Sequence, residues 1–235
     1  MDGDAPGGEP EACRALRADA ERNRAAILAA ATEVFAERGL DAPLEEIAGR
    51  AGVGIATLYR RFPCRERLVA DALASKVGQY AEAAEQARTV SDPWRAFSGF
   101  VERICELQAT DKGLAELLSM ALPPGEPVER IRSHANSQAE WLIGRAQVAG
   151  ALRADFTVED LLLLLIASAA VARVTAEDAP RAWRRFVALA LDGCRRRDGL
   201  TRLPPAPPAG GMPAAMRRFA TERGCGERAR GSRSG

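Results

Sequence analysis

The sequence predicts an all-α protein with an N-terminal three-helix domain, a larger C-terminal helical domain and about nine helices in all. Three observations support this fold class. Apolar residues recur at helical spacing along most of the 235 residues. The sustained apolar–polar alternation that is typical of strands is missing, and aromatic residues make up only 5% of the chain. Glycine and proline stand between the helical segments, where helices end.

The first predicted helix runs from Asn23 to Arg38. One of its faces is apolar, and Gly39 follows at the position where a helix commonly stops. The segment from Leu44 to Phe62 then predicts two short helices joined by a tight turn. Gly52 can adopt a positive φ without steric cost, so it can turn the chain after the first of these helices.

The second short helix, from about Ile55 to Phe62, has two different sides at about 100° per residue. Its apolar side consists of Ile55, Leu58 and Phe62. Its outward side consists of Ala56, Thr57, Tyr59 and Arg60. A small residue lets a helix enter the major groove, and arginine can donate two hydrogen bonds to guanine. This pattern favours a DNA-reading helix, and an ordinary αα-hairpin with a solvated outer face is the alternative.

Positive charge is concentrated at two ends of this unit. Residues 50–67 hold five arginines and one glutamate, and residues 14–24 hold four arginines and two carboxylates. Residues 33–46 between them have a net charge of −4, and the whole chain has a net charge of only +1. We expect the arginines to contact DNA phosphates, which makes binding depend strongly on salt.

These residues resemble the DNA-binding domain of the TetR family of transcriptional regulators, over about residues 23–71. The most specific matches are Val34–Gly39, Ile47–Ala48, Ala51–Gly54 and Thr57–Phe62. By the resemblance, the operator contacts come from Gly54, Ile55, Ala56, Thr57, Tyr59 and Arg60, and Arg65 contacts phosphate. Charge adds Arg50 and Arg61 to this set. Gly54 and Arg61 stand where many members have serine and histidine, which leaves the preferred DNA sequence open.

The pattern divides the chain into four parts. Residues 1–17 are expected to form a disordered arm, residues 18–78 the DNA-binding domain and residues 79–198 the C-terminal regulatory domain. Residues 199–235, rich in proline, glycine and arginine, are expected to form a disordered tail. This tail has a net charge of +5, which suits either a solvated tail or weak nonspecific DNA binding.

In the C-terminal domain, a long helix from Arg65 to about Ala87 is expected to link the two domains. Pro93 begins the next helix after Asp92, and Thr157 with Asp160 predicts a capping box. The remaining predicted helices span about 114–122, 128–149, 158–175 and 180–195.

The last two helices, near 158–175 and 180–195, are predicted to form a homodimer interface, because the first of them is apolar on all sides. A monomer with a well-buried hairpin is the alternative. The apolar stretch of residues 161–172 is too short to span a membrane. No N-terminal signal peptide is recognisable, so we expect a cytoplasmic protein without membrane contact.

The sequence favours neither catalysis nor metal binding. It contains one histidine, His134, and five cysteines without metal-like spacing, so no cofactor is expected. Cys64 begins a helix beside Arg65 and Arg67, an environment that favours thiolate. A redox switch at Cys64 is one hypothesis, and an inert residue at the helix start is the other.

By the resemblance, the C-terminal domain also holds a pocket for an unknown small-molecule effector. The candidate lining residues, each alternatively plain core, are Trp94, Phe97, Phe100, Ile104, Gln108, Met120, Gln138 and Trp141. The sequence therefore predicts a ligand-responsive regulator, a repressor that binds a palindromic double-stranded DNA operator as a homodimer and is released by its effector. A helical carrier or protein-interaction module without operator binding, and an enzyme on the same helical domain, are the alternatives.

Overall fold

The computed structural model describes residues 11–119, 126–208, 210–212, 214–215 and 218. Within these residues the chain is helical, without a strand of a sheet, and the predicted all-α fold is confirmed. The helices are α1 (Glu11–Arg38), α2 (Leu44–Arg50), α3 (Ile55–Arg61), α4 (Arg65–Thr89), α5 (Pro93–Thr110), α6 (Lys112–Ser119), α7 (Glu126–Val148), α8 (Val158–Val174) and α9 (Ala182–Cys194).

Helix α1 is longer than predicted. It begins at Glu11 rather than at Asn23, so residues 11–17, expected in a disordered arm, are helical. The reason is local composition: residues 11–38 contain neither glycine nor proline and are rich in alanine, arginine and glutamate, which favour helix. The rest of the expected arm, residues 1–10, lies outside the described residues.

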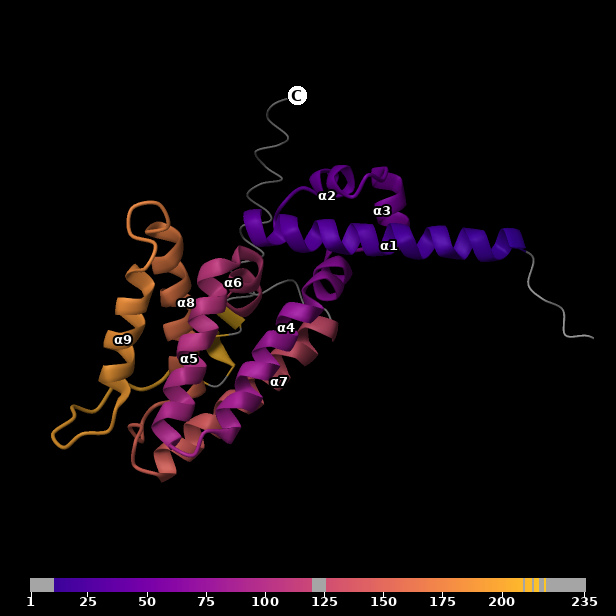
Figure 1. Cartoon of the computed structure of the whole chain (residues 1–235). Helices are drawn as coiled ribbons and strands as arrows, with labels where there is room; N and C mark the ends of the chain where they lie inside the picture. The colour runs from indigo at the N-terminus through magenta and orange to yellow at the C-terminus, as the bar shows by residue number, and fades with distance from the viewer. Residues whose placement is uncertain (1–10, 120–125, 209, 213, 216–217, 219–235) are drawn as a thin grey trace, which may run out of the picture.

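The N-terminal domain places α2 and α3 on the side of α1 that faces away from the C-terminal helices (Figure 1). Two glycines make this possible, because Gly39 and Gly52 have φ angles of 89° and 67° where the chain leaves α1 and α2. The largest fully buried side chains of the domain include Ile27, Phe35, Ile47, Leu58 and Phe62.

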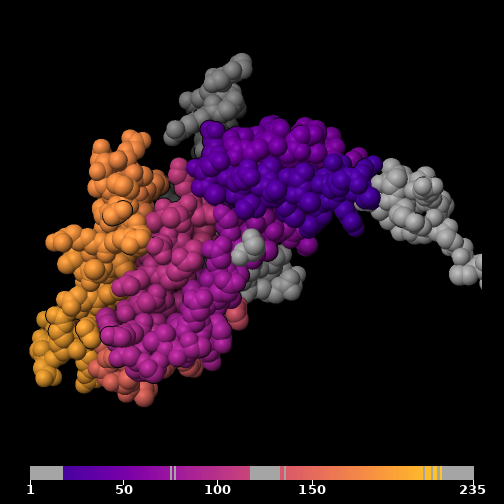
Figure 2. Space-filling model, viewed as in Figure 1, coloured from indigo at the N-terminus to yellow at the C-terminus, as the bar shows by residue number. Residues whose placement is uncertain are grey.

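Helix α4 connects the two domains. It packs against α1 in the N-terminal domain and against α5 and α7 in the C-terminal domain. The packing of α4 against α5 includes an edge-to-face contact between Tyr80 and Phe100, whose ring centroids lie 5.2 Å apart. Helix α6 lies against α1, and α8 and α9 form the side of the molecule away from α4 (Figures 1 and 2).

Two predicted helix starts are confirmed. The Asp92 carboxylate accepts a hydrogen bond from the backbone N–H of Arg95, and Pro93 occupies the first turn of α5. Thr157 and Asp160 form the reciprocal capping box at the start of α8. Such caps satisfy backbone N–H groups that have no partner inside the helix.

The chain after α9 departs from the expectation of a tail that is disordered from residue 199 onward. The backbone carbonyl of Thr201 accepts a hydrogen bond from the Arg153 guanidinium, and the N–H of Leu203 donates to Asp155. Arg153 is itself buried and joined to Asp155 through two nitrogens, which makes the pair a fixed anchor. Residues 219–235 lie outside the described residues.

None of the helices in the described part of the chain is long and apolar enough to span a membrane.

Candidate functional site

Helix α3 has the two sides that the helical period predicts. Leu58 and Phe62 are fully buried in the core, whereas Tyr59 is 50% exposed and Ala56 and Arg60 are exposed. Thr57 lies between the two sides and is half-buried. The outward side therefore offers a methyl group, two hydroxyls and a guanidinium.

The start of α3 adds the other predicted DNA residues. Gly54 is the N-cap, with an extended backbone, and its carbonyl accepts from the N–H of Thr57 at 2.9 Å. Gly54 is exposed and Ile55 is half-buried, packed against the core. Gly54 therefore places no side chain at the N-terminus of α3, and a Cβ added there would have no atom within 4 Å.

Arg50, at the end of α2, is held by α1. Its two terminal nitrogens pair with both carboxylate oxygens of Glu37, at 2.9 and 3.0 Å. This ion pair holds the pKa of Glu37 below its ordinary value, mainly through the hydrogen bond from Arg50. Arg50 therefore fixes α2 on α1, and this use competes with the predicted phosphate contact.

Arg65 also has an internal partner. One terminal nitrogen of its half-buried guanidinium donates to the carbonyls of Leu40 and Ala42, at 2.7 and 2.8 Å. Arg65 thus supports the loop between α1 and α2, which differs from the phosphate contact that the resemblance implies.

The remaining arginines divide into paired and unpaired groups. Arg24 and Arg67 both reach Asp71, at 2.5 and 3.1 Å. Among the described residues Arg60 has neither an ion pair nor a hydrogen-bond acceptor, and Arg61 is half-buried with an unpartnered Nε. Arg60 is therefore the guanidinium in this region that is most available to a ligand.

In the C-terminal domain, four of the candidate pocket residues share the inner side of α5. Phe97, Phe100, Ile104 and Gln108 are all buried there. Gln108 is the polar member of this group. Its Oε1 and Nε2 have no hydrogen-bond partner among the residues that the structure describes, although the residue is only 3% exposed. A buried polar group without a partner costs about 1–3 kcal/mol.

Trp94 adjoins this group, with 6.0 Å between its ring centroid and that of Phe97, whereas Trp141 and Gln138 contact Arg88 of α4. Trp141 is 39% exposed, lies under the Arg88 guanidinium at 4.1 Å, and sits beside Gln138, which accepts from the same arginine. Trp141 and Gln138 therefore lie on the side of α7 where Arg88 of α4 stacks on the aromatic face. Trp94 is half-buried beneath Arg195, and Met120 lies outside the described residues.

The structure adds a residue that sequence reasoning missed. Ser168 of α8 is 1% exposed and has no hydrogen-bond partner among the described residues apart from the neighbouring Cys105 thiol, which is a weak one. Burial raises the pKa of this thiol to about 11. The sequence feature that could have indicated Ser168 is its position as a polar residue inside the apolar helix α8.

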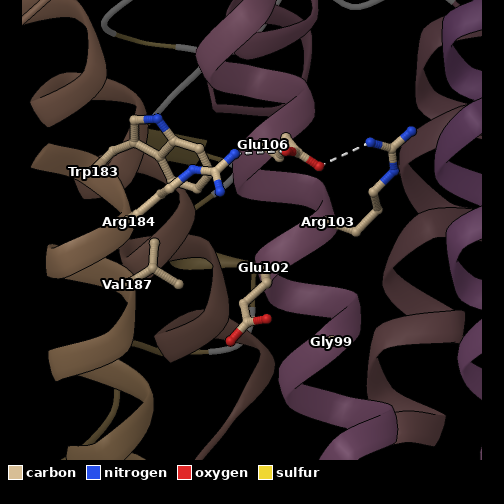
Figure 3. Close-up of a pocket in the computed structure, with 7 residues that line it drawn as sticks. All are labelled: Gly99, Glu102, Arg103, Glu106, Trp183, Arg184 and Val187. Carbon is tan, nitrogen blue, oxygen red and sulfur yellow. Dashed lines mark hydrogen bonds and ion pairs between the residues drawn. The ribbon is translucent and has the colours of Figure 1, made fainter. Parts of the chain in front are cut away.

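A surface groove of about 380 Å³ lies between α5 and α9 (Figure 3). Glu106 occupies its upper part and binds Arg184 of α9 at 2.8 Å and Arg103 of α5 at 3.0 Å. The charged groups of the groove thus largely satisfy one another, and none of the buried unpartnered atoms of the described residues belongs to it.

The two domains meet where α6 touches α1. The Glu116 carboxylate accepts from the backbone N–H of Leu40, and a Cβ on Gly113 would lie 2.9 Å from the carbonyl oxygen of Phe35. Lys76 of α4 pairs with Asp111, which also caps the start of α6 through the N–H of Leu114. The C-terminal and N-terminal domains are therefore joined by direct polar contacts.

The described residues contain no group of three histidine, cysteine, aspartate or glutamate side chains that could hold a metal ion. This geometry, a displayed short helix on a three-helix domain joined to a separate helical domain, defines the class of helix-turn-helix DNA-binding regulators.

Comparisons with known proteins identify the family within this class. Residues 27–72 match the model of bacterial regulatory proteins of the tetR family, and residues 92–196 match the C-terminal domain of SbtR-like transcriptional regulators. The TetR transcription regulatory protein from Mycobacterium vanbaalenii is 32% identical, over 77% of this chain and 99% of that chain, with a TM-score of 0.45. The chain belongs to the TetR family, and it is a DNA-binding transcriptional regulator.

Two further solved structures are similar to this chain. A TetR transcriptional regulator from Streptomyces coelicolor is 32% identical over 74% of this chain and 98% of that chain, with a TM-score of 0.47. The regulator FadR from Bacillus subtilis, in complex with stearoyl-CoA, shares the fold at 18% identity and a TM-score of 0.53, over 72% of this chain and 98% of that chain. The comparison with curated proteins found no match.

Proposed function

We propose that the protein is a homodimeric repressor that binds an inverted-repeat DNA operator through α3 of each copy and leaves it when a small molecule occupies the C-terminal domain. The observation that carries the proposal is the outward side of α3, where Arg60 is exposed without a partner among the described residues. We assign the protein no catalytic activity, and we place its action in the cytoplasm, where a bacterial operator lies.

Each outward group has a role at the operator. Arg60 donates to the acceptor edge of guanine, and Thr57 contacts a thymine methyl or a phosphate. Tyr59 and Arg61 position the helix through phosphates, and Gly54, Ile55 and Ala56 let the helix approach the groove closely. Arg50 and Arg65 support this surface from behind, because both are engaged with acceptors on α1 and the loop after it.

The outer surface of α8 and α9 supports the dimer. Leu163 and Val174 of α8 are 43% and 77% exposed, and Leu189 of α9 is 64% exposed. Positions 163, 170 and 174 fall on one side of α8, so its exposed apolar residues form a stripe rather than scattered points. A second copy would cover this stripe, and a twofold axis would place two reading helices about 34–36 Å apart on one side of the DNA.

Release follows from the way α4 joins the domains. A molecule that binds one arrangement of α5 and α7 better than another shifts α4, which packs on both, and so changes the spacing of the two α3 helices. The coupling is reciprocal, so operator DNA weakens effector binding by the same factor.

The experiment that tests operator reading is selection of bound duplexes from a random DNA library by the full-length protein. We expect an inverted repeat and an affinity that falls steeply with salt. Arg60→Ala should cost about 1–3 kcal/mol, roughly 5- to 150-fold, and relax the preference at one base pair of each half-site. The matched control is Arg103→Ala, since Arg103 is an exposed arginine of the C-terminal domain that pairs with Glu106 on α5. Unselective binding, or equal losses for both variants, would contradict the proposal.

The dimer is tested by the mass of the protein in solution. Leu189→Glu places a charge in the proposed interface and should give a monomer that binds the operator at least tenfold more weakly. Val148→Glu, on an apolar residue at the end of α7 that is still more exposed than Leu189, is the control and should remain dimeric. A monomeric wild-type protein would contradict this part of the proposal.

A further inference from the structure

We propose that the effector is an uncharged, largely apolar molecule whose polar group both donates and accepts a hydrogen bond, and that it binds the Gln108 carboxamide in the centre of the C-terminal domain. This inference rests on the proposed function, since it names the chemistry of the effector. It starts from the buried carboxamide of Gln108, whose oxygen and nitrogen both lack a hydrogen-bond partner within the described part of the chain.

The position of Gln108 makes it the polar end of an apolar surface. Residues 97, 101, 104 and 108 follow the helical repeat, so Phe97, Val101, Ile104 and Gln108 form one row along the buried side of α5. A molecule that lies along this row meets aromatic and aliphatic carbon over most of its length and an amide at one end.

Buried polar atoms in native proteins nearly always have partners, and an unpartnered one calls for an explanation such as a ligand or an ordered water. A glutamine carboxamide has two N–H donors and an oxygen with two lone pairs. One partner can satisfy both kinds of atom only if it donates and accepts, as a hydroxyl, a phenol or an amide does.

Ser168 supplies a second polar group that faces α5. In the described part of the chain its hydroxyl has no partner apart from the Cys105 thiol, and Cys105 lies one helical turn before Gln108. The Ser168 hydroxyl on α8 therefore meets α5 about one helical turn away from Gln108.

The surroundings argue against an ionised effector. The buried charged residues of the described chain are Asp111 and Arg153, and each is held by an opposite charge, Lys76 and Asp155. A carboxylate or ammonium beside Gln108 would lose its water without gaining a counter-charge, which is strongly unfavourable. A neutral polar group avoids that loss.

The first test needs no ligand. Gln108→Met keeps an unbranched side chain of similar size and removes the unpartnered amide. If the carboxamide has no hydrogen-bond partner in the ligand-free protein, this variant should melt about 2–4 °C above the wild type without ligand. Gln138→Met, on the outer surface of α7, is the control and should not raise the melting temperature. A lower melting temperature for Gln108→Met would show that the amide is satisfied within the free protein, and it would overturn the proposal.

The second test uses four small probes with the full-length protein: 1-octanol and 4-propylphenol as neutral donors and acceptors, and octanoate and octylamine as charged counterparts. Binding is followed by calorimetry without DNA. We expect at least one neutral probe to bind, at least tenfold more tightly than either ion, and to lose at least fivefold in affinity in Gln108→Met but not in Gln138→Met. Equal or tighter binding of octanoate or octylamine, no binding of either neutral probe, or an unchanged affinity in Gln108→Met would overturn the proposal.

These outcomes are separable from failure of the proposed function, because the binding of the probes is measured without DNA. A protein that binds the neutral probe through Gln108 but selects no DNA sequence would keep the site and contradict the repressor. A protein that selects an inverted repeat but prefers the charged probes would keep the repressor and contradict the site.

Discussion

The Glu116 carboxylate on α6 accepts a hydrogen bond from the backbone N–H of Leu40, with 2.5 Å between Oε2 and the nitrogen. The carbonyl of Leu40 in turn accepts from Arg65 at the start of α4, at 2.7 Å. A single residue between α1 and α2 is therefore held at once by the effector domain and by the helix that links the domains. A displacement of α6 would therefore act directly, through these hydrogen bonds, on the loop between α1 and α2 of the DNA-binding domain.

The first prediction concerns this contact. Glu116→Leu removes the acceptor, whereas Glu116→Gln keeps an oxygen in the same place. Loss of a hydrogen bond to a charged group costs about 1.5–3 kcal/mol, so we expect amide hydrogen exchange at residues 39–42 to be at least tenfold faster in the leucine variant. The glutamine variant should stay closer to the wild type. Equal exchange in the leucine variant and the wild type would mean that the contact does not hold the loop.

The second prediction uses the close approach of α6 to α1. A methyl group at Gly113 would meet the backbone of Phe35 at 2.9 Å, which neither helix can avoid by rotating a side chain. Gly113→Ala should therefore destabilise the protein by about 1–3 kcal/mol in urea unfolding. Gly144→Ala is the control, because its added carbon has nothing within 4 Å. It should be neutral or stabilising by up to about 1 kcal/mol.

The features predicted correctly from the sequence are those that a local rule decides. The helical period alone separates Leu58 and Phe62 from Tyr59 and Arg60, and the structure buries the first pair and exposes the second. The capping box at Thr157 is equally local, because both partners lie within one turn.

The features that sequence reasoning missed depend on contacts between distant segments. Nothing near Arg65 in the chain indicates that its guanidinium faces the carbonyls of Leu40 and Ala42. The helical spacing of Trp141 fits either a core or a surface position. Its surface position goes with the contact to Arg88, which lies on another helix. Likewise Arg153 anchors Thr201 across 48 positions of sequence, which composition alone could not predict.

The third prediction separates the two roles of Arg65. If its guanidinium supports the loop after α1, Arg65→Ala lowers the melting temperature by several degrees and leaves the salt dependence of operator binding unchanged. If it contacts phosphate instead, the slope of log affinity against log salt becomes shallower by about one. We expect the first result. Gel-shift titrations at several salt concentrations, beside thermal unfolding, distinguish the two.

The fourth prediction concerns the anchor of the segment after α9. The Arg153 guanidinium holds the pKa of Asp155 well below its ordinary range, with help from the N–H of Leu203. The ionised carboxylate therefore stabilises the anchor at neutral pH, and this contribution is lost as the pH falls from the ordinary range of aspartate toward the depressed value. Asp155→Asn should mimic that loss at neutral pH.

Limited trypsin digestion measures this effect at the bond after Arg202, between the two anchored residues. We expect cleavage there to be several-fold faster in Asp155→Asn than in the wild type, because loss of a charged hydrogen bond raises the population of the released segment. Asp192→Asn removes a carboxylate that pairs with Arg197 and does not touch residues 201–203, so it serves as the control. Equal rates for the wild type and Asp155→Asn would show that the carboxylate does not hold the segment.

The fifth prediction is a pH dependence that originates at Cys105. Burial raises the pKa of its thiol to about 11, from an ordinary value of 9.0. Above pH 9 the unfolded chain loses this proton while the folded chain keeps it, so stability falls as the pH rises and the loss reaches about 2 kcal/mol near pH 11. Cys105→Ala should start from a lower stability, because it removes buried volume, and should lose about 2 kcal/mol less between pH 8 and pH 11 in urea unfolding. The same loss in both proteins would show that the thiol titrates normally in the fold.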